Sequence, residues 1–164
     1  AASYISPVVS LNRIMEFPNA KVSLLDMVNE TTGEMYDAAV DCMGYHMLVT
    51  DRERNAYLKN AFHSLKNGAP MLFFRESYCE NAYDGIVDTY EQWKEICGED
   101  YENPSLRSDK NGKEVWIPLV PGRPNSIDGY IIEMQAVGFI IEEVIKMDTN
   151  RENPSSVSIF VKKP

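Results

Sequence analysis

The pattern of apolar and polar residues is most regular between residues 36 and 74, where it predicts a strand, a helix and a second strand in succession. Apolar runs predict the strands over 38–40 and 71–74. Between them, Thr50 and Glu53 have the spacing of a capping box, the side-chain pattern that begins a helix. The apolar stripe of that helix consists of Leu58, Ala61, Phe62 and Leu65. Two strands joined by a helix favour parallel pairing in an α/β fold.

Similar patterns predict further elements on both sides of this unit. In chain order, they are a helix over 6–18, a strand over 21–25, a helix over 127–137 and strands over 139–147 and 157–161. The last two strands are joined by a short turn, which favours an antiparallel hairpin. The sequence has no internal repeat, and its length is typical of one domain.

The stretch over 75–123 differs from the rest because it is rich in aromatic and acidic residues and has no sustained apolar period. A capping-box pattern at 89–92 predicts a short helix that continues through Trp93 and Ile96. Long insertions of this kind are often functional when they are ordered. We interpret 75–123 as an excursion from the core, and its aromatic residues fit a substrate lid and a small satellite core equally well.

Composition narrows the classes of partner and compartment. The chain has 164 residues and a net charge of -9, and an acidic surface repels the phosphates of nucleic acids. No apolar run approaches the roughly 20 residues of a membrane span. Cys42, Cys79 and Cys97 are odd in number and lack metal-site spacing, which predicts reduced thiols, no metal site and a cytoplasmic protein. The chain begins with Ala1 rather than Met, so we expect a segment upstream of it.

Polar residues gather where the predicted strands end, and they are the candidate site residues. The carboxyl ends of parallel strands meet at one edge of a sheet, where ligands bind. The three clusters are Asp26 with Met27, the loop 41–46, and the stretch 75–78. His46 is the candidate general base, while lining of the site and hydrogen-bonded packing remain open for it. Asp26 has the alternative of a turn or helix-cap acid.

Five blocks of sequence resemble consecutive parts of the class I S-adenosylmethionine-dependent methyltransferases. In chain order, they are YISP, LLDM, YDAAVDCMGYHML, LKNGAPMLFF and GYIIEMQAVGFIIEEV. Each block is degenerate alone, but their order and spacing are fairly specific and cover nearly the whole chain outside the excursion. The resemblance implies an α/β, Rossmann-like sheet that is mostly parallel and ends in an antiparallel hairpin. It also implies S-adenosylmethionine as the cofactor.

The resemblance also implies roles for individual residues. Asp26 would contact the adenine amino group, and the backbone N–H of Met27 would reach the adenine ring. The loop 41–46 would lie beside the methyl acceptor and the methionine part of the cofactor, with Asp41 and Cys42 on the cofactor side. The other candidates are His46 and Tyr45 for catalysis, and Glu76 and Tyr78 for substrate contact. The structural alternatives are a small apolar filler for Cys42 and a pocket wall for Tyr45.

Two features of the family are missing from the sequence. None of the nine glycines forms a G-x-G pair, so the glycine loop that holds the cofactor is absent. In addition, Tyr4 stands at the position where the family has the acidic residue that binds the ribose. The chain therefore resembles a single partial domain over 1–164 that lacks the first two strands. In the family's strand order 3-2-1-4-5-7-6, this loss leaves strand 3 roughly 14 Å from strand 4, too far to pair.

The resulting hypothesis is S-adenosylmethionine-dependent methyl transfer to a small-molecule acceptor, with this chain as part of the catalytic domain. The alternative is a non-catalytic interaction subunit, or a truncated fragment that does not bind the cofactor alone. Unpaired edges of apolar strands promote association. We therefore expect a homo-oligomer, or a partner chain or upstream segment that supplies the missing strands.

Overall fold

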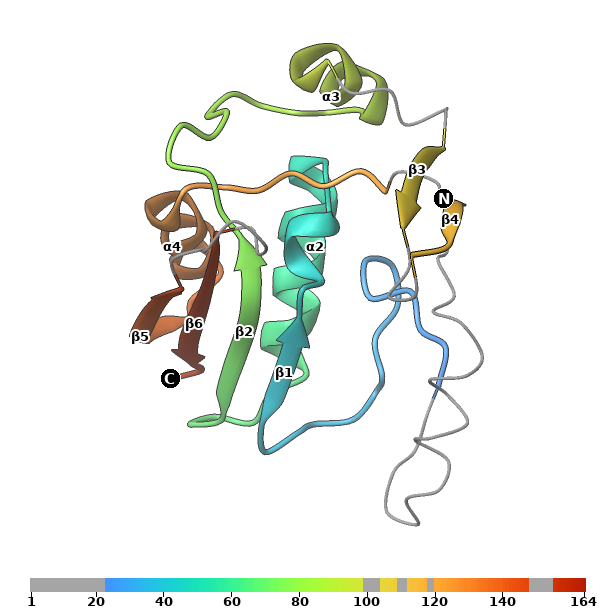
Figure 1. The fold of residues 1–164 in the computed structure, drawn as a ribbon. Coiled ribbons are helices and arrows are strands. Elements are labelled where there is room, and N and C mark those ends of the chain that lie inside the picture. The colour runs from blue at the N-terminus through green and yellow to red at the C-terminus, as the bar shows by residue number, and fades with distance from the viewer. Residues whose placement is uncertain (1–22, 99–103, 109–111, 118–119, 148–154) are drawn as a thin grey trace.

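The computed structural model describes residues 23–98, 104–108, 112–117, 120–147 and 155–164. The helix predicted over 6–18 lies outside these residues. The described part contains a four-stranded sheet with two helices on one face, and a long segment crosses above the ends of two strands (Figure 1).

The sheet has the order β1-β2-β6-β5 and confirms the strands predicted from the apolar runs. Its members are β1 (Ala39–Cys42), β2 (Pro70–Ser77), β5 (Ile140–Met147) and β6 (Ser156–Lys162). β1 pairs with β2 in parallel, and β6 pairs antiparallel with both β2 and β5. This order matches strands 4-5-7-6 of the expected series, and the C-terminal hairpin is confirmed. The α/β fold is as expected, but with no strand before β1 in the described part, the sheet there is mixed rather than mostly parallel.

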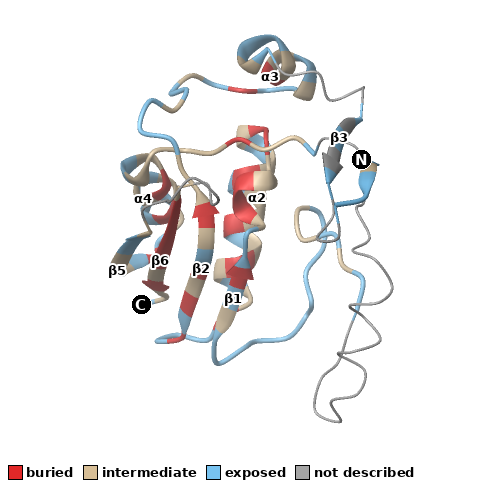
Figure 2. Ribbon diagram, in the orientation of Figure 1, coloured by how far each residue is buried: buried red, intermediate tan, exposed pale blue. Residues whose placement is uncertain are grey.

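Two helices cover the same face of the sheet and enclose the main core. α2 (Asp51–His63) begins with the predicted capping box, in which the Thr50 hydroxyl accepts from the Glu53 N–H and the Glu53 carboxylate accepts from the Thr50 N–H. α4 (Ile127–Ala136) is capped by Ser126, as expected. Buried residues concentrate between these helices and the strands (Figure 2). They include Leu58, Ala61, Met71, Phe73, Met134, Val157, Ile159 and Val161.

The opposite face of the sheet carries no helix in the described part of the chain (Figure 1). Four large apolar residues on this face are exposed, namely Val40, Phe74, Ile140 and Ile145. Val40 is the most open of them, at 68% exposure. The outer edge of β1 also has no neighbouring strand among the described residues, so an exposed apolar face adjoins a free strand edge.

After β2 the chain leaves the sheet, and it returns at α4. This excursion contains α3 (Tyr90–Cys97) and an antiparallel pair of β3 (Ser105–Ser108) and β4 (Glu114–Ile117). α3 confirms the short helix predicted after position 89, whereas the β3–β4 hairpin is not evident in the apolar pattern. Val49, Val87 and Trp93 form a small second core. The excursion runs over the carboxyl ends of β1 and β2 (Figure 1).

The strand expected over 21–25 is wrong for the residues that the structure describes. Residues 23–26 have no regular structure, and Leu24 is 83% exposed; residues 21 and 22 lie outside the described part. A strand needs a neighbour to satisfy its backbone groups, and residues 23–26 pair with none of the described strands. The apolar run has a strand-like pattern, but the described residues offer it no pairing partner.

Candidate functional site

The loop after β1 is shaped by the side chain of Asp41. This residue is 7% exposed, and its Oδ1 accepts a hydrogen bond from the N–H of Gly44 at 3.0 Å. A Cβ at position 44 would collide with the same carboxylate, so glycine is required there. The loop continues into a 3₁₀ helix, η1 (Tyr45–Met47). The cofactor contact expected of Asp41 does not fit this inward position of its side chain.

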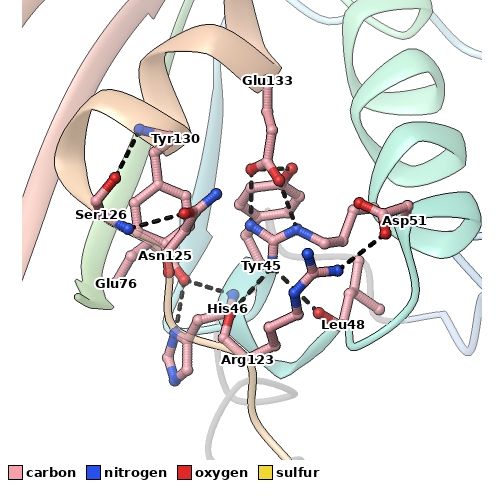
Figure 3. Close-up of polar contacts among 12 residues, drawn as sticks. Tyr45, His46, Leu48, Asp51, Glu76, Arg123, Asn125, Ser126, Tyr130 and Glu133 are labelled. Carbon is pink, nitrogen blue, oxygen red and sulfur yellow. Dashed lines mark hydrogen bonds and ion pairs between the residues drawn. The ribbon is translucent and has the colours of Figure 1, made fainter. Parts of the chain in front are cut away.

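His46 and Glu76 form a buried pair at the carboxyl ends of β1 and β2 (Figure 3). Glu76 Oε2 lies 2.6 Å from His46 Nδ1 and accepts a second hydrogen bond, from the His46 backbone N–H, at 2.8 Å. The Ser77 N–H also points at this nitrogen, at 3.4 Å; this longer contact would need an unprotonated Nδ1 and is much the weaker of the two. Because an ionised carboxylate only accepts hydrogen bonds, the short contact places a proton on Nδ1. Nε2 is then the basic nitrogen of the neutral ring.

Glu76 is completely buried, so the substrate contact expected of it does not fit its position. A β-bulge between Phe73 and Glu76 sets where this side chain points. Arg75 within the bulge and Met43 after β1 both have left-handed backbone conformations, with φ of 59° and 57°. Strained non-glycine residues tend to gather at functional sites, and here they flank the ends of two neighbouring strands.

The ring edge of His46 that carries Nε2 borders the excursion. Nε2 makes no hydrogen bond to the described residues, and a methyl group added at Gly122 would lie 3.9 Å from the adjacent Cδ2. Arg123 donates its N–H to the His46 carbonyl at 2.7 Å. Trp93 of α3 donates its Nε1–H to the Gly122 carbonyl at 3.2 Å. The excursion is therefore positioned to cover whatever approaches Nε2.

Two carboxylate oxygens behind this pair are buried without a hydrogen-bond partner among the described residues: Asp41 Oδ2 and Glu76 Oε1. Burial, and next the neighbouring charge of Glu76, raise the pKa of Asp41 to about 6. The Tyr57 hydroxyl and the Gly44 N–H counteract part of this rise. Asp41 thus holds a proton much more readily than an ordinary aspartate does.

Tyr45 was expected at the catalytic centre, but it belongs to the core. It is completely buried, and its hydroxyl donates a hydrogen bond to Glu133 Oε2 at 2.9 Å. Burial raises the pKa of this hydroxyl, which keeps it protonated. The Arg54 guanidinium lies 4.3 Å from the Tyr45 ring centroid and donates to both Glu133 oxygens, at 2.9 and 2.7 Å. This buried cluster fastens α2, α4 and η1 together and does not present Tyr45 to a substrate.

Arg123 fastens the excursion to the start of α2. Its guanidinium donates to the carbonyls of Val49 and Gly85 at 3.0 Å each, and to Asp51 Oδ2 at 3.2 Å. It also lies 5.8 Å from the ring centroid of Trp93. The small second core is therefore held to the site by a buried cation as well as by apolar contact.

Sequence reasoning did not single out Arg54, Arg123 or Glu133. A signal exists for Arg54, which stands four residues before Leu58 and so lies on the buried stripe of α2. Glu133 likewise stands three residues after the buried Tyr130. No local pattern distinguishes Arg123.

The other candidate residues do not converge on one point. The Asp26 carboxylate accepts from the Val28 and Asn29 N–H groups and from the Asn29 amide, which is the turn-acid alternative. These interactions lower its pKa, the Asn29 side chain most. The Met27 carbonyl accepts from Asn60 of α2 at 2.9 Å.

The remaining candidates, Cys42 and Tyr78, lie apart from this turn. Cys42 is an exposed free thiol, and Tyr78 is a half-buried ring beside Lys146. The exposure of Cys42 rules out the apolar-filler alternative.

Two further kinds of site are absent from the part of the chain that the structure describes. None of the described helices has both the length and the apolar character needed to cross a membrane. Among the described residues, no group of three or more His, Cys, Asp or Glu side chains is arranged to hold a metal ion.

The sequence matches no family model and no curated protein, but the structure matches many solved ones. An S-adenosylmethionine-dependent methyltransferase from Clostridium acetobutylicum superimposes with a TM-score of 0.61 at 12% identity, over 94% of this chain and 69% of its own. The fold is that of the S-adenosylmethionine-dependent methyltransferases. One from Mesorhizobium loti matches this methyltransferase fold with a TM-score of 0.58 at 12% identity, over 96% and 77% of the two chains. The 1,6-didemethyltoxoflavin-N1-methyltransferase of Burkholderia thailandensis, with bound 1,6-didemethyltoxoflavin and S-adenosylhomocysteine, gives 0.61 at 10% identity, over 97% and 58%.

The described residues do not form a complete cradle for S-adenosylmethionine. Asp26 is engaged in its own turn, Asp41 is turned inward, and the sequence contains no glycine loop. The residues whose geometry suits a chemical role are His46 and Glu76, at the carboxyl ends of β1 and β2.

Proposed function

We propose that this chain forms part of the catalytic domain of an S-adenosylmethionine-dependent methyltransferase that acts on a small molecule. The observation that carries the proposal is the His46–Glu76 pair at the carboxyl end of β1, within a methyltransferase fold. Support for a small-molecule acceptor comes from the Burkholderia thailandensis structure, which holds 1,6-didemethyltoxoflavin. S-adenosylmethionine would supply the methyl group.

In this proposal His46 removes the proton of the acceptor. Its Nδ1–H is directed at Glu76, so Nε2 carries the lone pair and faces the excursion. The buried Glu76 carboxylate orients the ring and stabilises the imidazolium that forms when Nε2 takes up the proton. An acceptor with an ionisable O–H or N–H suits this chemistry.

The excursion would act as the cover on the substrate side. It reaches His46 through Gly122 and Arg123, and α3 is joined to the same strip by Trp93. A cover that excludes water strengthens the interaction between His46 and Glu76 and keeps the acceptor in line for transfer.

The second candidate, a non-catalytic interaction subunit, is favoured by a different observation. The free edge of β1 adjoins the exposed Val40, and the sequence contains no glycine loop. Calorimetric titration with S-adenosylmethionine tests whether the cofactor contacts are missing from this chain, which both candidates assume. The 164-residue chain alone should bind weakly or not at all, and a dissociation constant in the micromolar range or below would mean that the cofactor contacts have been misjudged.

The catalytic test uses radiolabelled S-adenosylmethionine and a panel of small phenols, amines and carboxylates, on the protein assembled with the segment or chain that completes its sheet. His46→Gln should lower methyl transfer roughly 100-fold or more, the usual contribution of a general base. Glu76→Gln should lower it less, because the ring remains but loses its orientation. His63→Gln is the matched control, since His63 is the only other histidine and is exposed on α2. Equal activity of the His46 and His63 variants would reject His46 as the base.

A further inference from the structure

The Glu76 carboxylate is only half satisfied by the contacts that hold His46. Oε2 receives the backbone N–H and Nδ1 of His46, at 2.8 and 2.6 Å, while Oε1 is buried without a partner among the described residues. A buried carboxylate oxygen without a donor is costly, and buried polar atoms in folded proteins nearly always have one. Some group close to Oε1 is therefore expected to donate to it.

Asp41, which lies near Glu76, also has a buried carboxylate oxygen without a hydrogen-bond partner among the described residues. It lies on the strand next to Glu76 and on the same face of the sheet, since Asp41 is paired with Phe73 and the bulge returns Glu76 to the Phe73 side. Its Oδ1 is held by the Gly44 N–H, and its Oδ2 is buried without a partner among the described residues. If Asp41 Oδ2 carried a proton, it could donate a hydrogen bond to Glu76 Oε1, and both oxygens would then have a partner.

We propose that Asp41 is a positioning residue of the His46–Glu76 pair and that, in its protonated form, it donates a hydrogen bond to Glu76 Oε1. This assignment rests on the proposed function for its role in catalysis, but not for its geometry. The proton belongs on Asp41 rather than on Glu76, because Glu76 already receives two donors from His46. Asp41 then acts on His46 through Glu76, by fixing the carboxylate in the orientation that receives the His46 ring.

The groups that face Asp41 agree with this assignment. Glu76 faces it from β2 and the Tyr57 hydroxyl from α2, while the N–H groups of Gly44 and Tyr45 face it from the loop. The largest causes of its pKa shift are burial and the charge of Glu76, which hydrogen-bond donors offset in part, and the pKa rises to about 6. Above that pH the two carboxylates repel each other, and the hold on His46 should weaken.

The test measures how firmly Glu76 holds the His46 backbone N–H, by amide hydrogen exchange followed with NMR at about pH 5 and about pH 8. The protection of this N–H is divided by that of the Arg54 N–H, which bonds to Thr50 within α2 and reports general opening. In the unmodified protein the ratio should fall by roughly tenfold from the lower to the higher pH, the loss of one hydrogen bond to a charged group.

Asp41→Asn supplies the decisive comparison, because its amide donates to Glu76 at every pH and its oxygen still accepts from Gly44. The ratio should then stay high and change less than about twofold with pH, whereas Asp41→Ala should give a low ratio at both pH values. Asp37→Asn is the matched control: Asp37 is exposed and pairs with Lys66, so this variant should keep the pH profile of the unmodified protein.

The assignment is overturned if Asp41→Asn keeps the pH-dependent fall, or if the unmodified protein shows none. Should Asp41→Ala fail to fold, the comparison of Asp41→Asn with the unmodified protein decides alone. The exchange measurement needs neither cofactor nor acceptor, so failure of methyl transfer would reject the proposed function and leave this result standing.

Discussion

Replacing Asp41 by asparagine is expected to stabilise the protein, and to do so more strongly as the pH rises. Asp41 is 7% exposed, and its pKa is raised from 3.8 to about 6 by burial and by the charge of Glu76. Ionising it in the folded state therefore costs free energy that ionising it in the unfolded chain does not. Asparagine has nearly the same shape, can accept from Gly44 through its oxygen, and never ionises.

The size and sign of the effect follow from the shift in pKa. A group whose pKa is higher in the folded state contributes stability below its unfolded value, and that contribution is lost as the pH rises through the folded value. For Asp41 the window runs from the unfolded value of 3.8 to about 6. At about 1.36 kcal/mol per pKa unit, the full loss is on the order of 3 kcal/mol. The Asn variant should gain that amount relative to the unmodified protein between about pH 4 and pH 8.

Urea unfolding followed by circular dichroism at several pH values measures this difference directly, provided that the denaturant slope is the same for both proteins. Asp37→Asn serves as the control, because an exposed ion pair contributes less than about 1 kcal/mol. A free-energy difference between Asp41→Asn and the unmodified protein that does not change with pH would refute the reasoning. It would mean that Asp41 is ionised as easily in the folded chain as in the unfolded one.

The remaining predictions concern the core, a helix cap and association. Arg54→Ala should lower the free energy of unfolding by about 3–5 kcal/mol in urea, because it leaves Glu133 without its partner; a loss below about 1 kcal/mol would contradict the role of the buried pair. Thr50→Ala should cost about 1 kcal/mol in the same assay through the lost cap, while Thr50→Ser should be nearly neutral. The 164-residue chain should self-associate in light scattering, and Val40→Lys should shift it toward monomer by placing a charge beside the free edge of β1. A monodisperse monomer of 18.6 kDa before any substitution would show that the edge is already protected.

The parts of the fold that local sequence determines were predictable. The capping box at Thr50 and the apolar runs of β1 and β2 each use an interaction within a few residues, so their patterns survive in the sequence. The strand expected over 21–25 fails for the opposite reason. Its apolar pattern is suitable for a strand, but a strand forms only when it pairs with another one. The residues of a strand do not themselves determine whether such a partner is present.

The candidate site was predictable in place but not in detail. Polar residues at strand ends predicted that residues 41–46 and 75–78 lie close together, and the structure places His46 in contact with Glu76, because a parallel pair brings those ends together. Which way each side chain points depends on features that sequence patterns do not carry. The bulge at Arg75 turns Glu76 inward behind His46, and the tight turn at Gly44 lets Asp41 fold back under the loop. The buried Arg54–Glu133 pair joins residues from two helices, and only the three-dimensional fold brings them together.

The position of β6 between β2 and β5 also bears on how quickly this molecule can fold. Phe73 is paired with Ile159, so β2 and β6 can pair only when the intervening chain, which includes the excursion and α4, has folded back onto the sheet. Pairings between residues far apart in the sequence form slowly. Each halving of the intervening loop should lower the entropic free-energy cost of closing that loop by roughly 0.6 kcal/mol. If that closure limits the rate, removal of nearly all of the excursion, which about halves the chain between Phe73 and Ile159, should make refolding about threefold faster. The same excursion that covers His46 would then set the pace at which the sheet assembles.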